Sequence, residues 1–192
     1  TVAIASRWQH LPALRAHYAF AEVSPMLRMA VHPLDFRPAA ATALVQRLHL
    51  DAAPALQALY AHGGEYAPDA FSPSQVAEGV FYGIYAGAEL AAAGGTHLVA
   101  REVGVAAVGN IYVHPAQRGR GYATAVTSAI TAHLLAERLT VVLNVNERNA
   151  AALAVYTKLG YRPACRFIEG VGRQVSNDQT SSRNEKTTRS KL

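Results

Sequence analysis

The 192-residue sequence predicts an α/β domain built on a mixed β-sheet. Apolar residues make up 51% of the chain and charged residues 16%, which is typical of a folded protein with a sizeable core. Between residues 41 and 170, short runs rich in β-branched and aromatic residues alternate with segments of helical periodicity. Hairpin patterns come first and β-α-β patterns second, so we expect antiparallel and parallel strand pairs in one sheet.

Three zones follow from the composition. Residues 1–40 form an N-terminal extension, with a helix expected over Leu11–Ala21 and a strand over Met26–His32. We expect this extension to pack on the domain; a remnant of a second lobe is the alternative. Residues 41–170 form the domain itself. Residues 171–192 are polar and poor in apolar side chains, which predicts a disordered, basic tail.

The first half of the domain is expected to contain a strand, two helices and a hairpin. The strand covers residues 43–48, and Asp51 stands where the N-cap of the first helix should be. Ser72-Pro73-Ser74-Gln75 has the capping-box pattern, with proline at the first helical position, so a short helix should follow. Residues 80–86 and 89–99 read as strands that turn at Gly87.

The second half is expected to alternate strands with helices. A strand over 105–113 leads to a helix over 121–137, whose apolar residues recur every four positions. The continuous apolar run 141–145 predicts a strand buried on both faces. A helix over 149–159 should end at Gly160, before a last strand over 161–168. Residues 171–175 are too polar to predict a further strand.

The turn between the 105–113 strand and the following helix has the features of a phosphate cradle. Gly119 and Gly121 allow a tight turn and close approach of a ligand, and Arg118 and Arg120 add positive charge. The first amides of the helix have no internal partner and lie at the positive end of its dipole. The sequence matches neither a Walker loop nor the dinucleotide fingerprint. The alternative is a basic turn that binds nothing.

A second pair of candidate residues lies on the next helix. Asn149 and Tyr156 are seven positions apart, so they lie on the same helix face, about 10 Å apart along the axis. Asn149 could reach a ligand from the first turn, and Tyr156 could present its hydroxyl to a thiolate. The alternative is that Asn149 is an N-cap and Tyr156 a core residue.

These two stretches resemble the GCN5-related N-acetyltransferases. Arg118-x-x-Gly121-x-Ala123 after a strand matches their Arg/Gln-x-x-Gly-x-Gly/Ala motif. Their next motif is similar to Leu143-Asn144-Val145-Asn146 with Asn149, Ala152, Tyr156, Gly160 and Tyr161. The resemblance covers about residues 41–169 and is nearest to the FR47-like branch.

The resemblance implies a largely antiparallel mixed sheet, splayed at its middle, with helices on both faces. It implies acetyl-CoA as cofactor, with the pantetheine arm paired to the edge of a splayed strand. An acceptor amine would attack the thioester directly, a strand amide would stabilise the oxyanion, and Tyr156 would protonate the departing thiolate as a catalytic acid. The implied cofactor-binding residues are Ile111, Tyr112, Val113, Arg118, Gly119, Arg120, Gly121, Tyr122, Ala123, Asn149 and Tyr156.

The chain departs from the family at the catalytic base. In the histone-type branch a glutamate on the strand before the phosphate loop is the base, and Ala107 stands near that position here. On the same strand, Asn110 and Tyr112 are the nearest polar residues. His97, on the adjacent strand, is the best-tuned candidate base, because an unperturbed histidine titrates near neutral pH. Glu65 and water are the alternatives.

The charge and cysteine content bear on partners and compartment. The chain has 18 basic and 13 acidic residues, and five of the basic ones lie in the last 21 residues, so we expect no nucleic-acid partner. The single Cys165 excludes a multi-cysteine zinc site, and we expect no metal. No apolar run suggests a membrane partner. We expect a cytoplasmic protein, with a homodimer as one assembly open to it. Ser190-Lys191-Leu192 equals a peroxisomal signal, which we interpret as coincidence.

The sequence therefore predicts an N-acetyltransferase that transfers the acetyl group of acetyl-CoA to a primary amine of a small molecule or peptide. Because the family's glutamate is missing, a non-catalytic acyl-CoA sensor on the same fold is the alternative. A nucleic-acid binder that uses the basic loop and tail is the third hypothesis, and salt-dependent DNA binding lost on tail removal would favour it. The acceptor itself stays open, because loops that vary freely bind it.

Overall fold

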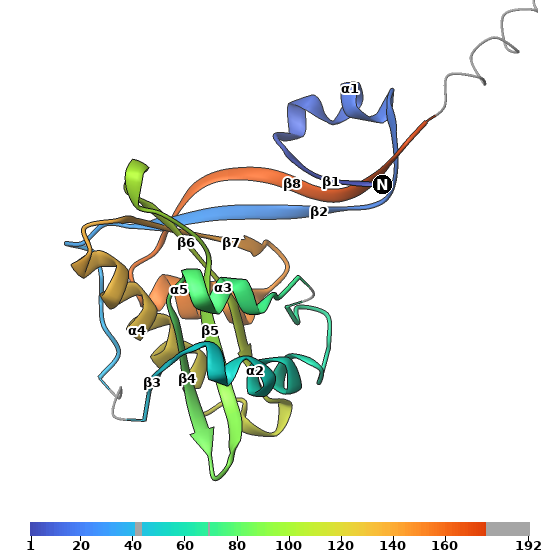
Figure 1. Ribbon diagram of the computed structural model, residues 1–192. Helices are drawn as coiled ribbons and strands as arrows, with labels where there is room; N and C mark the ends of the chain where they lie inside the picture. Colours follow the sequence, from blue (N-terminus) through green and yellow to red (C-terminus); the bar gives the residue numbers. More distant parts are fainter. Residues whose placement is uncertain (41–43, 69, 176–192) are drawn as a thin grey trace, which may run out of the picture. The chain divides into compact units, whose positions relative to one another are not determined.

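A computed structural model describes residues 1–40, 44–68 and 70–175. The chain divides into two compact units, which we call the terminal unit (Thr1–Met26 and the chain from Arg166 onward) and the central unit (Leu27–Cys165). The strands hydrogen-bond in the order β1-β8-β2-β7-β6-β5-β4-β3, in a mostly antiparallel sheet (Figure 1). The predicted mixed sheet with helices is therefore confirmed.

In the terminal unit, β1 (Val2–Ser6) pairs antiparallel with β8 (Arg162–Gln174) in a regular five-residue register. The short helices η1 (Trp8–His10) and α1 (Leu11–Arg15) follow, and then the long strand β2 (Tyr18–Val31). The predicted helix to Ala21 is wrong beyond Arg15. From Tyr18, aromatic and β-branched residues alternate with small or charged ones, and this period of two favours a strand.

Strand β8 extends to Gln174, so the prediction of no strand over residues 171–175 is also wrong. Pairing with β1 holds this polar segment through backbone hydrogen bonds, which do not depend on apolar side chains. Gly172 gives room for the Tyr18 side chain, which would press against any Cβ there. The predicted disorder of the rest of the tail, and the Ser190-Lys191-Leu192 ending, lie outside the described residues.

The central unit holds most of the predicted elements. Its elements are β3 (Gln46–Leu48), η2 (Leu50–Ala52), α2 (Ala53–Tyr60), α3 (Pro73–Glu78), β4 (Phe81–Ala86), β5 (Glu89–Ala100), η3 (Arg101–Val103), β6 (Val105–Val113), η4 (Pro115–Gln117), α4 (Tyr122–Ala136), β7 (Thr140–Asn146) and α5 (Ala150–Lys158). The capping box at Ser72 and Gln75 is confirmed, with both side-chain to backbone bonds present. Asp51 is not an N-cap: a 3-10 turn precedes α2, and Ala52 takes the cap position.

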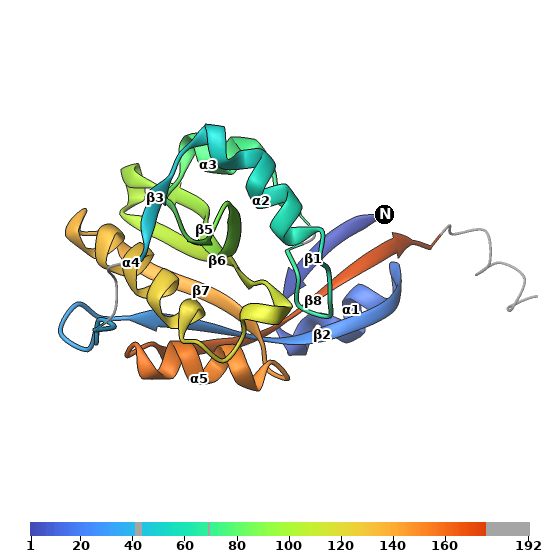
Figure 2. The same ribbon diagram turned by 90° about the horizontal axis from the view of Figure 1, so that it is seen from below.

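Two apolar clusters form the core of the central unit, one on each face of its strands (Figures 1 and 2). On one face, α4 buries the predicted stripe Val126, Ile130 and Leu134 completely, next to α5. On the other face, α2 and α3 cover a smaller cluster that contains Leu56 and Phe81. Within the described residues, no helix is long and apolar enough to cross a bilayer.

Strand β7 is buried on one face only, contrary to the prediction from its apolar run. Val141, Leu143 and Val145 are buried, whereas Asn144 on the opposite face is exposed. The Asn144 side chain accepts a hydrogen bond from Nε of Arg28, at 3.0 Å. One face of β7 thus packs in the core, and the other carries a polar side chain with a hydrogen-bond partner.

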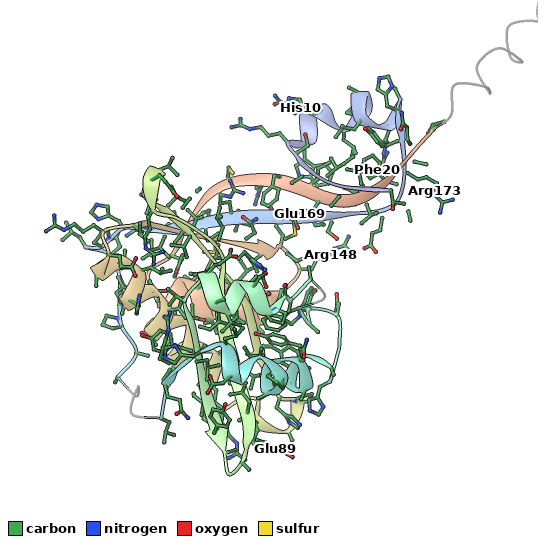
Figure 3. All side chains as sticks on the ribbon, viewed as in Figure 1. His10, Phe20, Glu89, Arg148, Glu169 and Arg173 are labelled. Atoms are coloured by element: carbon green, nitrogen blue, oxygen red, sulfur yellow. The ribbon has the colours of Figure 1, made fainter. Side chains whose placement is uncertain are left out.

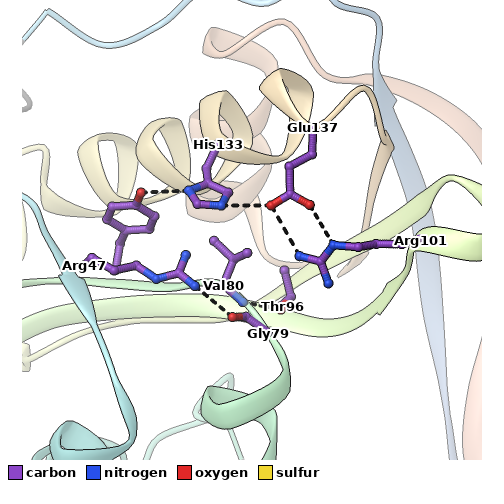
Figure 4. Close-up of polar contacts among 8 residues, drawn as sticks. Arg47, Gly79, Val80, Thr96, Arg101, His133 and Glu137 are labelled. Atoms are coloured by element: carbon purple, nitrogen blue, oxygen red, sulfur yellow. Dashed lines mark hydrogen bonds and ion pairs between the residues drawn. The ribbon is translucent and has the colours of Figure 1, made fainter.

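A polar chain ties the C-terminal end of α4 to the strands beside it (Figure 4). Arg101 binds Glu137 through two guanidinium nitrogens, Glu137 contacts His133 at 3.0 Å, and His133 contacts the Tyr82 hydroxyl at 3.0 Å. The hydrogen bond from Arg101 is the main reason that the pKa of Glu137 is lowered. Because these groups are partly exposed, we expect them to orient α4 more than to stabilise it.

A glycine provides a test of the packing between α5 and the segment after β2. Gly160 has φ +95°, and a Cβ there would overlap the backbone carbonyl oxygen of Asp35. Gly87 also has a positive φ, +66°, but a Cβ there would meet nothing. We expect Gly160→Ala to lower the free energy of unfolding by about 2–4 kcal/mol and Gly87→Ala by about 1 kcal/mol, measured by denaturant titration. Equal losses would show that the Asp35 contact carries no cost.

Candidate active site

The central feature of the site is the divergence of two parallel strands. The pairing of β6 with β7 runs from Val105↔Thr140 to Val108↔Leu143 and stops there, although both strands continue. Residues 109–113 of β6 therefore have no partner in β7. The splayed strand that the sequence predicted at Ile111–Val113 is present, and its edge can pair with an extended ligand.

A β-bulge produces the divergence. Asn110 has φ +54°, a left-handed conformation that is uncommon for a residue other than glycine. The pairing with β5 confirms one extra residue in β6 here, since Gly95 is opposite Gly109 and Ala93 is opposite Tyr112. Bulges bend the strand that carries them and redirect its following residues.

Side chains of α2 and α3 form hydrogen bonds with Asn110, the residue at the bulge. The Tyr60 hydroxyl of α2 donates to the backbone oxygen of Asn110 at 2.9 Å, and the Asn110 side-chain amide donates to Oε1 of Gln75 in α3 at 3.1 Å. The Tyr60 ring also packs edge-on against Tyr112. Burial raises the pKa of Tyr60 strongly, so its hydroxyl stays protonated and keeps donating. Neither Tyr60 nor Gln75 was a predicted site residue. The capping-box pattern marked Gln75, but only as part of a helix cap.

The loop predicted as a phosphate cradle, residues 118–123, which we call the glycine loop, contains two left-handed glycines. Gly119 and Gly121 have φ +77° and +78°, and a Cβ on either would meet nothing within 4 Å. Gly121 is the N-cap of α4, and the first intrahelical bond runs from the Ala125 amide to the Gly121 oxygen. The amides of Tyr122, Ala123 and Thr124 consequently have no partner inside the helix. Amides without an intrahelical partner at the positive end of a helix dipole suit an anion such as a diphosphate.

The two arginines of this loop behave differently. The Arg118 side chain donates to the Val113 oxygen at 3.4 Å, and its guanidinium carbon lies 5.9 Å from the centre of the Tyr112 ring. Arg120 is exposed and makes no ion pair with a described residue. His114 lies in the loop after β6, and its Nδ1 accepts from the Ala116 amide.

The structural roles given above as alternatives for Asn149 and Tyr156 are both present. Asn149 is the N-cap of α5, and its side-chain oxygen accepts from the Ala152 amide at 3.1 Å. This leaves its NH2 group as a donor for a ligand. Tyr156 is a core residue, and burial raises its pKa to about 12. Among the described residues, its hydroxyl makes no hydrogen bond, so the donor remains available.

The two candidate bases lie in different surroundings. His97 sits in a bulge of β5, and its ring covers Gly109 at the point where β6 leaves β7. Desolvation lowers the pKa of His97 below its usual value, although part of the residue is exposed. Glu65 is exposed in the loop after α2, where it raises the pKa of the neighbouring Tyr66. Arg148, labelled in Figure 3, acts electrostatically on the same Tyr66.

A shallow hollow of about 390 Å³ lies elsewhere, in the terminal unit. Phe20 and Arg173, both labelled in Figure 3, contribute to its lining. None of its lining residues belongs to the motifs described above. Within the described ranges, no group of three or more histidine, cysteine or acidic side chains could hold a metal ion.

Comparisons with known proteins agree with this geometry. Residues 81–168 match the model of the FR47-like protein family. A GNAT-family protein from Novosphingobium aromaticivorans superposes with a TM-score of 0.70 at 24% identity, covering 83% of this chain and 68% of that one. A GNAT-family acetyltransferase from Colwellia psychrerythraea gives 0.61 at 18% identity, covering 89% and 64%. The chain thus spans about two thirds of the length of these proteins.

A shorter enzyme matches at nearly its full length. The ribosomal-protein-S18-alanine N-acetyltransferase from Escherichia coli gives a TM-score of 0.54 at 19% identity, covering 70% of this chain and 96% of that one. A search of curated proteins found no match. The matched stretch contains the splayed end of β6, the loop with Gly119 and Gly121, and helix α5 with Tyr156. Residues 81–168 thus resemble the FR47-like family, and the chain has the fold of the GNAT-family acetyltransferases.

Proposed function

We propose that the chain is an N-acetyltransferase that transfers the acetyl group of acetyl-CoA to a primary amine of a small molecule or peptide. The observation that carries this proposal is the free edge of β6 after Val108, which leads within a few residues to the unpartnered amides that follow Gly121. A strand edge suits the amides of the pantetheine arm, and helix amides suit a diphosphate. The two ligand chemistries lie in the order in which coenzyme A contains them.

Each implied cofactor-binding residue has a proposed role. Ile111, Tyr112 and Val113 would bind through backbone groups, because the Tyr112 side chain is buried on the α2 side. The amides from Gly119 to Ala123 would hold the diphosphate, and the side chains of Arg118 and Arg120 would neutralise it. The free NH2 of Asn149 would donate to the pantetheine or diphosphate end.

Tyr156 is the proposed proton donor. Acetyl-CoA, when bound, supplies a thioester whose sulfur leaves as a thiolate. With its pKa raised to about 12, the Tyr156 hydroxyl stays protonated at neutral pH, so it can donate a hydrogen bond there. A thiol has a pKa near 8.5, so complete transfer from this hydroxyl is uphill. We therefore propose that Tyr156 stabilises the departing sulfur mainly by hydrogen bonding.

His97 is the proposed proton acceptor for the amine. Its lowered pKa keeps the imidazole neutral near pH 7, and a neutral imidazole can accept a proton directly or through water. Its ring lies against Gly109, where the gap between the strands begins. Glu65 is less suited, since it is exposed and engaged by Tyr66.

A non-catalytic acyl-CoA sensor is the second candidate function. The observation in its favour is Ala107, which stands near the position of the family's glutamate. Binding of coenzyme A without thiol release, over a panel of amines, amino acids, polyamines and peptides, would support the sensor. Release of free thiol with any of these acceptors would support the enzyme.

The cofactor site is tested by a charge placed in the glycine loop. Gly121→Glu puts a carboxylate among the amides proposed to hold the diphosphate, so calorimetry should show that acetyl-CoA binding is lost. Gly87→Glu is the matched control, because Gly87 also has a positive φ and open space around it. That variant should bind like wild type. Undiminished affinity of Gly121→Glu would contradict the proposed site.

The role of Tyr156 is tested by removing its hydroxyl alone. Tyr156→Phe should keep the core packing and the acetyl-CoA affinity, while kcat falls by about 10²-fold. Thiol release with an identified acceptor measures this; acetyl-CoA hydrolysis serves until one is found. A kcat within about threefold of wild type would mean that Tyr156 is a core residue only.

The raised pKa of Tyr156 also predicts alkaline sensitivity. The folded protein retains this phenolic proton to about pH 12, whereas the unfolded chain loses it near pH 10, so ionisation favours unfolding as pH rises between these values. The free energy of unfolding of wild type should fall relative to Tyr156→Phe by on the order of 2 kcal/mol from pH 9 to pH 12. Tyr60 and Tyr161 are common to both proteins, so their contributions largely cancel. Denaturant titrations that show a constant difference would contradict the assignment.

A further inference from the structure

The segment that follows α2 is fastened to the splayed strand at two points. The Tyr112 hydroxyl donates to the backbone oxygen of Gly63 at 2.7 Å. The rings of His62 and His114 pack edge-to-face, with centroids 4.1 Å apart. Tyr112 and His114 lie a few residues before the glycine loop, so residues 61–66 are attached to the same stretch of backbone that leads into the cofactor site.

Tyr112 also lies against Arg118, a residue of the glycine loop. The Arg118 guanidinium lies over the Tyr112 ring, and its Nε reaches the Val113 oxygen. One side chain thus contacts an arginine proposed to bind phosphate and a carbonyl of the 61–66 segment. Because Tyr112 is buried and packs edge-on against Tyr60, its ring has little freedom to move independently of its backbone.

The segment itself carries exposed polar groups. Glu65 raises the pKa of the neighbouring Tyr66, and Arg148 from the turn after β7 lowers it through its charge. The segment from α2 and the turn after β7 therefore approach one another near the ends of the two diverging strands. Both Gly63 and Gly64 have positive φ, and a Cβ on either would meet nothing, so no neighbouring atom crowds these two positions. The Ala67 amide donates to the Gly64 oxygen within the same segment.

We propose that Tyr112 is a positioning residue that couples occupancy of the glycine loop to the order of residues 61–66. This inference rests on the proposed function. A ligand that pairs with Ile111–Val113 fixes the backbone of the strand, and the hydrogen bond from Tyr112 to Gly63 passes that restraint to the segment. Coenzyme A binding then orders Glu65 and Tyr66 before an acceptor amine arrives. This coupling requires no new contact between the segment and the strand, because the hydrogen bond from Tyr112 to Gly63 is already present.

Hydrogen exchange of the full chain, with and without coenzyme A, tests the proposal. In wild type, coenzyme A should slow amide exchange in residues 118–125 and also in residues 61–66, each by about fivefold or more. In Tyr112→Phe, residues 118–125 should still be protected, while exchange in 61–66 should stay within about twofold of the free protein. Tyr82→Phe is the matched control, since it removes a hydroxyl that bonds His133, and it should behave like wild type.

The outcomes separate the inference from the function on which it rests. Protection of 61–66 that persists in Tyr112→Phe overturns the coupling and leaves the cofactor site intact. Protection of 118–125 absent in wild type overturns both. If Tyr112→Phe does not fold, wild type decides the coupling. Coenzyme A that protects 118–125 and leaves exchange in 61–66 unchanged overturns it.

Discussion

The site depends on one hydrogen bond, from the Tyr60 hydroxyl to the backbone oxygen of Asn110. Asn110 adopts a left-handed conformation that a residue with a side chain seldom takes, and the structure around it supplies the compensation. The amide of its own side chain bonds Gln75, and burial keeps the Tyr60 hydroxyl protonated. Without these partners the bulge would lose its stabilisation, and β6 could continue to pair with β7.

Several features of the central unit follow from that bulge. The pairing of β6 with β7 ends two residues before it, and the rest of β6 is left with a free edge. Tyr112 then points toward α2 and Gly63, while the chain reaches Gly119 and Gly121 at the start of α4. The two helices on the α2 side thus hold the strand, and the helix on the opposite face presents its amides. A ligand with amides at one end and phosphates at the other suits this arrangement.

The polar groups of the central unit form two sets, one largely buried and one partly exposed. Tyr60 and Asn110 are buried and Gln75 is partly buried, so the hydrogen bonds among them are costly to leave unmade. The Arg101, Glu137 and His133 chain is partly exposed, and salt and water weaken it. Substitutions in the first group should therefore affect the geometry of the strands, and substitutions in the second should affect it little.

The sequence by itself determined the local features: the order of elements in the central unit, the capping box at Ser72, the tight glycine turn before α4 and the apolar stripe of α4. Each depends on neighbours within a few positions, which periodicity and turn chemistry report. Tertiary structure decided the rest. Residues 171 and 172 belong to a strand because β1 pairs with them, and residues 18–21 lie in β2 although the sequence predicted a helix there. The roles of Tyr60 and Tyr112 depend on contacts about 50 residues apart along the chain, which no local pattern encodes.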